Sequence, residues 1–486
     1  MKRALVLVGL AAALAACNIS GHRKPDVTLP TAFEAPRGST VLPTAALDRW
    51  WTIFNDAQLN GLEDDALRLS PDAKTQIARL QEARASEWSQ IFQTLPTGNL
   101  TGSASSKQTN NIGARSNSLI PIGGKSESET LAFDPTWELD FYGGLAVARN
   151  VAKSDAAATR FDAEAARASL VANVADSYFQ AEGLAIQLVD ARESVRIEEQ
   201  LYAIATRKAE LGLGPASDAD RIAGDLAQAK SQVESLEAEL HAAQRLLLIL
   251  VGRGVEPVES LPVKAEAAEP PPAPAAVPGE ILVRRPDVRE AEARMQSAAG
   301  RSKLAKLQLF PNLMLEPTLG LARTVAPGVA FIPPATLAPQ QQTTATDYWS
   351  IGVGLVQPVL DIPRLLADAK AQDARTEQSV IAYEQSVQNA YGDAENALVR
   401  LSADERRLAI LRDGEARSRR AYEAGRTRYA DGLDELTAAL TTEQEWRSAR
   451  SALTSERVQA LRRAVQVYKA LGGGWASTTV TTARAQ

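Results

Sequence analysis

The sequence predicts a mainly helical fold with a β-strand contribution, built from two copies of one unit. Three observations lead to this prediction. A segment of the first half recurs in the second half, each half contains stretches that alternate apolar and polar residues, and two runs of about 65 residues contain no proline. Each unit is therefore expected to contain a helix, a β-hairpin, a long helix, a turn and a returning helix.

The composition excludes several classes of protein. With 53 Lys and Arg against 59 Asp and Glu, the 486-residue chain has a formal net charge of −6 and a pI near 5.4. A nucleic-acid binder normally carries a basic face, so binding to nucleic acid is not expected. One cysteine rules out a disulfide framework, and two distant histidines, His22 and His241, do not predict a metal site.

The first residues have the pattern of a secretory signal peptide, which we assign to residues 1–16. A basic pair precedes an apolar run of 13 residues, Ala4–Ala16. A membrane-spanning helix needs about 20 residues, so this run is too short to span. It leads into Leu14-Ala15-Ala16-Cys17, which resembles a bacterial lipobox. The resemblance implies cleavage before Cys17 and a covalent N-acyl diacylglycerol lipid, including palmitate, on that residue. Asn18 in place of Asp implies no signal for inner-membrane retention. The alternative is an ordinary cleavage site beside an incidental cysteine.

The internal repeat divides the chain. Residues 70–96 align with residues 285–311 without a gap, and both segments begin a predicted helix with Pro-Asp and end in proline. Further along, Tyr202, Gly212 and Gly252 recur 220 positions later as Tyr422, Gly432 and Gly472. We therefore expect a first repeat at 17–268, a proline-rich connector at 269–278, a second repeat at 279–475 and a tail at 476–486.

One β-hairpin is expected in each repeat, at about 98–141 and at about 312–359. Segments of this length suit membrane strands of about 9–11 residues, although a half-buried soluble sheet gives the same alternation. The secretion signal favours membrane strands. Because four strands cannot close a barrel and open sheet edges are not stable in hydrocarbon, several chains must then share one barrel. The clearest alternation places apolar side chains at Leu131, Phe133, Trp137, Leu139 and Phe141.

Long helical hairpins are expected at about 143–251 and at about 361–471. The proline-free runs, Leu145–Leu211 and Arg364–Tyr429, would each extend about 100 Å as helices. The second repeat has an irregular seam, because Glu456 interrupts the apolar spacing. Periodicity alone would also fit a fibrous or adhesive coiled coil. The returning helix of the first repeat has a strict heptad seam, formed by Ile222, Leu226, Ala229, Val233, Leu236, Leu240, Ala243, Leu247 and Leu250.

Five motifs follow one another in a characteristic order: Trp50–Asp56, Trp137–Gly143, Arg284–Asp287, Phe310-Pro311 and Gln357–Asp361. Together with the duplication and the lipobox, they resemble the outer-membrane factors of the TolC/OprM type, and within them the NodT-like efflux lipoproteins. The resemblance covers nearly the whole mature chain. It implies a TolC-like homotrimer in which three copies of four strands form a β-barrel in the outer membrane. The helices of the trimer would continue this pore as an α-helical barrel across the periplasm.

The same resemblance implies that the turns at 212–220 and 432–435 form the periplasmic tips of the duct. Contact with a periplasmic adaptor is expected at Gly212, Leu213, Gly214, Gly432 and Leu433. A ring of charged residues could form an aperture that attracts cations and repels anions. The candidates for this aperture are Asp218, Asp220, Arg221, Asp431, Asp434 and Glu435. The alternative is that these residues are solvated helix caps, and Thr441 stands where many relatives carry an aspartate.

The function implied by the resemblance is an exit duct in the outer membrane, part of a tripartite, RND-type multidrug efflux system. The duct would passively conduct small molecules from the periplasm or pump to the exterior. Its implied partners are a periplasmic adaptor protein, an inner-membrane RND-type pump and outer-membrane lipid. We expect no enzyme, no catalytic residue, no metal and no cofactor besides the lipid, since no nucleophile has a plausible histidine partner. Two alternatives remain: the outer-membrane channel of a type I protein secretion system, and a lipid-anchored coiled-coil structural protein without a pore.

Overall fold

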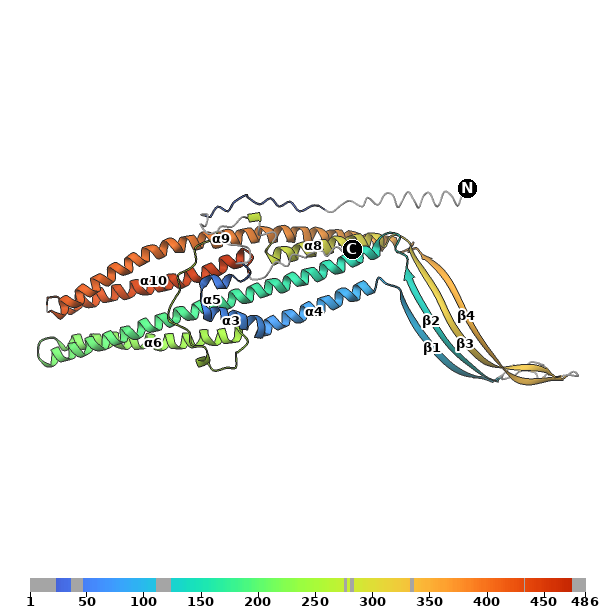
Figure 1. The fold of residues 1–486 in the computed structure, drawn as a ribbon, viewed down its shortest axis with the longest axis horizontal. Helices are drawn as coiled ribbons and strands as arrows, with labels where there is room; N and C mark the ends of the chain where they lie inside the picture. Colours follow the sequence, from blue (N-terminus) through green and yellow to red (C-terminus); the bar gives the residue numbers. More distant parts are fainter. Residues whose placement is uncertain are drawn as a thin grey trace. The chain divides into compact units, whose positions relative to one another are not determined.

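The computed structural model describes residues 23–35, 47–110, 124–274, 278–279, 284–332, 336–431 and 433–473. Cys17, Gly432, the tail at 476–486 and part of the connector lie outside the described residues. The elements follow one another as helices with two inserted strand pairs (Figure 1). The mainly helical prediction with a smaller β contribution is confirmed. No described helix is both long and apolar enough to cross a membrane.

The helices repeat in length as well as in order. The two shorter helices that precede the strands, α4 and α8, both have 22 residues, and the returning helices, α6 and α10, both have 35. The long helices α5 and α9 have 67 and 69 residues. Their bounds are α3 Ala57–Leu69, α4 Pro71–Phe92, α5 Gly144–Glu210, α6 Ala216–Leu250, α8 Pro286–Leu307, α9 Ile362–Ala430 and α10 Leu436–Ala470, with 3-10 turns η1 Trp50–Phe54 and η2 Val258–Ser260.

By its contacts the chain divides into two compact units, and these do not coincide with the two sequence repeats. One unit contains residues 84–156 and 294–379, with the sheet and the adjoining helix segments. In this unit α8 is held on both sides. The Ser297 hydroxyl donates to Asp155 of α5 at 2.6 Å, and the Thr376 hydroxyl of α9 donates to the carbonyl of Ala298 at 3.1 Å.

The strands form one antiparallel sheet in the order β1-β2-β3-β4, so that β1 and β4 lie at its edges (Figure 1). A row across the sheet joins Leu100, Phe133, Leu319 and Trp349, whose side chains share one face because directly paired residues point the same way. All four are exposed. The sheet therefore presents an apolar face to its surroundings. Its strands are β1 Thr97–Thr109, β2 Gly124–Glu138, β3 Asn312–Ile332 and β4 Thr336–Val356.

Two strand ends differ from the alternation in the sequence. The alternation continues to Phe141, but β2 ends at Glu138, because Asp140 accepts a hydrogen bond from the amide of Leu145 at 3.0 Å and so begins α5. In the second repeat the pairing extends well past the apolar stretch, from Val325 opposite Thr343 to Ile332 opposite Thr336. Ladder hydrogen bonds join backbone atoms, so the strands extend through residues 325–332 and 336–343 without alternation of apolar and polar side chains.

The other unit contains the helical hairpins and a buried aromatic cluster. Trp50 and Trp51 are fully buried, and the ring of Trp50 stacks on Tyr468 of α10 with centroids 5.6 Å apart. Phe54 contacts Phe179 of α5 at 4.9 Å. The tryptophan-rich motif thus joins α5 to α10, and burying these rings stabilises the junction by several kcal/mol (about 1.5–3 for each large side chain).

The heptad seam of α6 is buried as its spacing predicts. All nine predicted seam residues of α6 are buried or half-buried, whereas most residues between them are exposed. In α10, Glu456 lies on the buried face, only 5 % exposed, and forms an ion pair with Arg407 of α9 at 2.9 Å. The irregular seam residue is therefore accommodated by a guanidinium from the facing helix.

One hydrogen bond links the start of α3 to α5. Asp56 caps α3 by accepting from the amides of Gln58 and Leu59, and the hydroxyl of Tyr178 donates to its other oxygen at 2.7 Å. Replacing Tyr178→Phe removes the donor of this bond to a carboxylate, and we expect a loss of about 1–3 kcal/mol in the free energy of unfolding. Denaturant unfolding in detergent measures it. Tyr142→Phe, whose exposed hydroxyl has no bond among the described residues, is the control and should leave the midpoint unchanged; equal loss in both variants would contradict this role.

Candidate functional site

The first candidate tip is the turn between α5 and α6. The amide of Leu213 donates to the carbonyl of Lys208 at 2.9 Å, and the amide of Gly212 donates to Ala209 at 3.0 Å. Gly212 has φ +68°, the left-handed conformation in which glycine ends a helix without steric cost. This geometry turns Leu213 outward, where its side chain is 74 % exposed.

The second candidate tip, between α9 and α10, ends its helix in the same way. The amide of Leu433 donates to the carbonyl of Arg428 at 2.8 Å, and the Leu433 side chain is 69 % exposed. Each hairpin therefore has an exposed leucine at an equivalent position, and the first tip has a second one, Leu211, which is 55 % exposed. An exposed apolar side chain at the end of a long helical pair is suited to insertion into a partner protein.

The predicted aperture residues differ in their environments. Asp434 forms a two-point ion pair with Arg428, at 2.7 and 2.9 Å, and this hydrogen-bonded guanidinium lowers the pKa of Asp434. Asp434 is thus neutralised locally by its partner. Of the others, Asp218 is half-buried. Within the described residues, no ion pair is formed by the remaining candidates, which are Asp218, Asp220, Arg221, Asp431 and Glu435. Their role in an aperture stays a prediction.

The two tips are linked within the chain. The ammonium group of Lys208 donates to the hydroxyl of Tyr429 at 3.1 Å and lies 4.4 Å from the centroid of its ring. Lys208 belongs to the last turn of α5 and Tyr429 to the last turn of α9. This contact combines a hydrogen bond with a cation–π interaction and holds the ends of the two long helices together.

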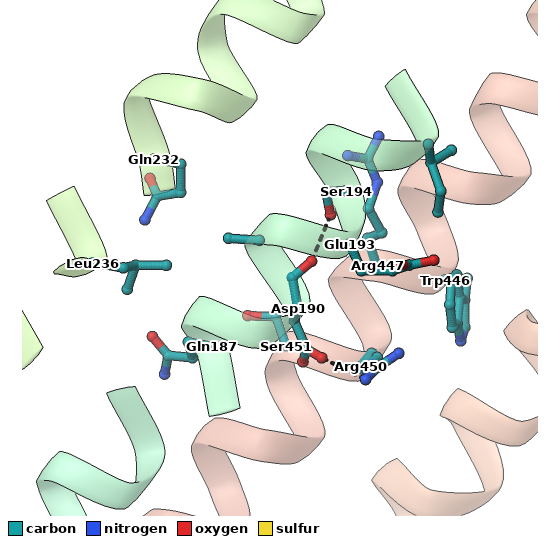
Figure 2. A pocket seen from close by; sticks show the side chains of 12 residues that line it. Gln187, Asp190, Glu193, Ser194, Gln232, Leu236, Trp446, Arg447, Arg450 and Ser451 are labelled. Carbon is teal, nitrogen blue, oxygen red and sulfur yellow. Dashed lines mark hydrogen bonds and ion pairs between the residues drawn. The ribbon is translucent and has the colours of Figure 1, made fainter. Parts of the chain in front are cut away.

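Behind the tips lies a pocket of about 230 Å³ that the sequence did not reveal (Figure 2). It is lined by α5, α6 and α10. Figure 2 shows Asp190 on α5 directed at Arg450 on α10, with which it forms an ion pair. Trp446 lines the same pocket, and its indole N–H donates to Glu415 at 3.0 Å.

A second group of charges lies beside this pocket. Arg447 of α10 pairs with Glu198 of α5 at 2.9 Å and with Glu443 of its own helix at 3.4 Å. Burial raises the pKa of Glu443 to about 7; the Arg447 guanidinium opposes the rise and Glu198 adds to it. One guanidinium therefore faces two buried carboxylates, and one of the carboxylates titrates near neutral pH. This cluster is ionisable but holds no nucleophile and no histidine.

Sequence reasoning missed this cluster because its members come from two repeats. The available signal was the placement of Arg447 and Arg450 beside the seam residues Trp446 and Ala449. Nothing in the spacing indicated which carboxylates of α5 would face them. Among the described residues, no group of three or more His, Cys, Asp or Glu could hold a metal ion.

Comparison with known proteins identifies the family of this chain. The family described as "Outer membrane efflux protein" matches residues 62–253 and 277–473. The chain belongs to this family. Its similarity to individual members extends over nearly the full length, as two curated relatives and one solved structure show.

The pyoverdine export outer membrane protein OpmQ of Pseudomonas aeruginosa is 28 % identical over 433 residues, 88 % of each chain. The cation efflux system protein CusC of Escherichia coli O6:H1 is 25 % identical over 476 residues, covering 96 % of this chain and 97 % of CusC. The solved outer-membrane channel OprN superposes with a TM-score of 0.74 at 26 % identity, covering 94 % of this chain and 97 % of OprN. The predicted relationship to TolC-like outer-membrane factors and the predicted fold class are confirmed, and this chain is an outer-membrane efflux duct.

The raised pKa of Glu443 makes the stability of the contact between α5 and α10 depend on pH. The folded pKa of about 7 exceeds the ordinary value of 4.5, so this group's stabilising contribution is complete below about pH 4.5 and is lost as pH rises through 7. Replacing Glu443→Gln removes the titration. Between pH 5 and pH 8 the wild type should lose on the order of 1–3 kcal/mol more stability than the variant.

Denaturant midpoints at the two pH values measure this difference. Glu445→Gln, which changes an exposed carboxylate on the same helix, is the matched control and should retain the wild-type pH dependence. Identical pH profiles for the wild type and Glu443→Gln would contradict the assignment.

Proposed function

We propose that this efflux duct is a homotrimer that passively conducts small molecules out of the cell as part of a tripartite, RND-type system. Family membership supports the outer-membrane efflux role. The single observation that carries the assembly is the sheet, whose edge strands β1 and β4 have no partner strand among the described residues. In hydrocarbon such edges must be paired.

Three copies would supply twelve strands, which is within the range of closed membrane barrels, whereas one copy with four strands is not. Helix α4 supports association of copies as well. None of its residues is buried, and Ile77, Trp88 and Phe92 are each more than half exposed. A 22-residue helix with such an apolar surface is normally covered by a partner.

The proposed partners follow from the lipobox cysteine and from the two hairpin tips. We propose that Cys17 carries an N-acyl diacylglycerol lipid, including palmitate, that anchors the protein in the outer membrane, because several acyl chains on one residue give stable attachment. At the hairpin tips, the exposed Leu213 and Leu433 are suited to contact with a periplasmic adaptor, and the adaptor would connect the duct to an inner-membrane RND-type pump.

The cargo is set by the pump rather than by the duct. Two relatives of similar identity to this chain are named for different cargoes, pyoverdine for OpmQ and cations for CusC. A wide pore with few contacts to a passing molecule discriminates little. We therefore assign this chain a small-molecule efflux role without narrower cargo specificity.

Purified oligomeric protein should form discrete ion-conducting channels in a planar bilayer, because a closed barrel leaves an aqueous path. Single-channel current recording tests this, with the heat-dissociated chain as the control. A lipid-anchored coiled coil without a pore would give no channels, so a properly assembled oligomer that never conducts would overturn the proposal. Export of a protein substrate by cells that carry this chain would instead favour a type I secretion role.

Replacing Cys17→Ser should abolish incorporation of radiolabelled palmitate, since the side chain would no longer accept a diacylglycerol group. Gel autoradiography of cells grown with the label measures the incorporation. Asn18→Gln, which preserves the cysteine, is the control and should label like the wild type. Persistent labelling of Cys17→Ser would sink the lipid-anchor assignment.

A further inference from the structure

Three of the five sequence motifs meet at the base of the sheet, where the strands join the helices. The ring of Tyr142, from the motif Trp137–Gly143, lies 4.9 Å from the ring of Phe310. Gln357, which begins the last motif, donates through its side-chain amide to the carbonyl of Leu309 at 3.1 Å. These contacts define a junction between strands and helices, which we call the basal junction.

Large apolar side chains are exposed at the basal junction. Phe141 and Tyr142 precede α5, and Leu360, which precedes α9, is 95 % exposed. Trp137 is exposed at the end of β2, and the alternation of the strand places it on the same apolar face as Phe133. Aromatic side chains of membrane proteins gather at the two boundaries of the bilayer, at the level of the lipid headgroups. The basal junction therefore has the side chains of a membrane boundary.

The backbone of the basal junction supports the same position. Residues 93–96 and 139–143 belong to no helix or strand. Irregular backbone is not stable where it faces hydrocarbon, because its amides and carbonyls need water or protein partners. With the sheet in the membrane, as proposed above, its base lies at the level of the headgroups.

A pocket of about 400 Å³, which we call the basal pocket, lies at this junction. It is lined by residues 94–96, which connect α4 to β1, and by residues from the segment 137–149, which joins β2 to α5. Its lining includes the exposed apolar side chains of Leu95, Trp137 and Phe141. Because Trp137 belongs to the apolar face of the sheet, the basal pocket is continuous with that face.

Arg149 of α5 brings a positive charge to the basal pocket. Its Nε donates to the hydroxyl of Thr94 at 2.6 Å, and Thr94 donates in turn to the carbonyl of Ile91 at 2.7 Å. Thr94 is almost fully buried, so it fixes the position of the guanidinium. Among the described residues Arg149 forms no ion pair, which leaves its two terminal nitrogens for a ligand. A guanidinium held in this way matches the oxygens of a phosphate group.

Two acidic residues line the same pocket. Asp140 accepts hydrogen bonds from the amides of Leu145 and Ala146, at 3.0 and 3.4 Å, at the start of α5. Glu138 is exposed and has no hydrogen bond or ion pair within the described part of the chain. These carboxylates would repel a purely anionic ligand, whereas a ligand with a phosphate and an ammonium group finds a partner for each charge. The lining therefore fits a zwitterionic headgroup.

We propose that the basal pocket binds a phospholipid with an ammonium headgroup, such as phosphatidylethanolamine. The phosphate contacts Arg149, the ammonium group contacts Glu138, and the acyl chains extend past Trp137 along the apolar face of the sheet. A headgroup held at the basal junction fixes the depth of the sheet in the bilayer. The inference rests on the proposed placement of the sheet in the membrane, and it adds a specific lipid site to the duct.

Native mass spectrometry of the purified oligomer tests this binding. The detergent is supplemented with phosphatidylethanolamine or with phosphatidylglycerol of the same acyl chains, and the noncovalent lipid retained per chain is counted. We expect about one phosphatidylethanolamine per chain in the wild type. Retention should be at least about tenfold weaker in Arg149→Gln, because a charge-assisted contact with the phosphate is lost. Lys153→Gln, which removes an exposed cation one turn further along α5, is the matched control and should bind like the wild type.

A second variant tests the headgroup. Glu138→Gln removes the partner of the ammonium group, so this variant should retain phosphatidylglycerol as well as phosphatidylethanolamine. A wild type that already retains the two lipids equally would overturn the zwitterionic assignment. An Arg149→Gln variant that keeps its phosphatidylethanolamine would overturn the site itself.

The outcomes separate this inference from the proposed function. Circular dichroism and single-channel recording of Arg149→Gln verify that the helices and the pore form, so a loss of lipid is not a loss of folding. A conducting oligomer that retains neither lipid above background would overturn the lipid site while the duct stands. A wild type that neither assembles nor conducts would overturn the proposed function, and the lipid site with it.

Discussion

The free edges of the four-stranded sheet are the constraint on which the rest of this molecule depends. Strands β1 and β4 each present one row of backbone groups that the described part of the chain leaves without a partner strand. In a membrane each unpaired backbone group costs several kcal/mol, and the proposed assembly of copies would pair these two edges. The exposed row of Leu100, Phe133, Leu319 and Trp349 fits the same constraint, because an apolar face is stable only against lipid or protein.

A buried aromatic cluster joins helices of the two repeats. Trp50, Phe54, Phe179 and Tyr468 bring together the segment before α3, the middle of α5 and the end of α10. Because α5 and α10 belong to different repeats, burying these rings joins the two hairpins at one level. At their far ends the long helices α5 and α9 are linked by the hydrogen bond from Lys208 to Tyr429.

The sequence predicted most of the fold but less of the candidate site. The predicted bounds of the long helices differ from the observed ones by only one or two residues, because proline, glycine and the heptad spacing act locally. The Ile222–Leu250 seam is buried as predicted. The hairpin predicted at about 312–359 contains β3 and β4, but the pairing of their outer halves has no signal in apolar alternation, because it joins backbone atoms. The cluster of Glu198, Glu443 and Arg447 also escaped, since it depends on which faces of two distant helices meet. Contacts of this kind are determined by tertiary packing and leave no local pattern in the sequence.

Duplication alone would create an ambiguity that this chain has to resolve. Two identical repeats would make the contact within a copy and the contact between copies interchangeable, and nothing would favour a closed assembly over open or mispaired ones. The two repeats differ in charge: α6 has six acidic and three basic residues, whereas α10, equal in length and equivalent in bounds, has three and six.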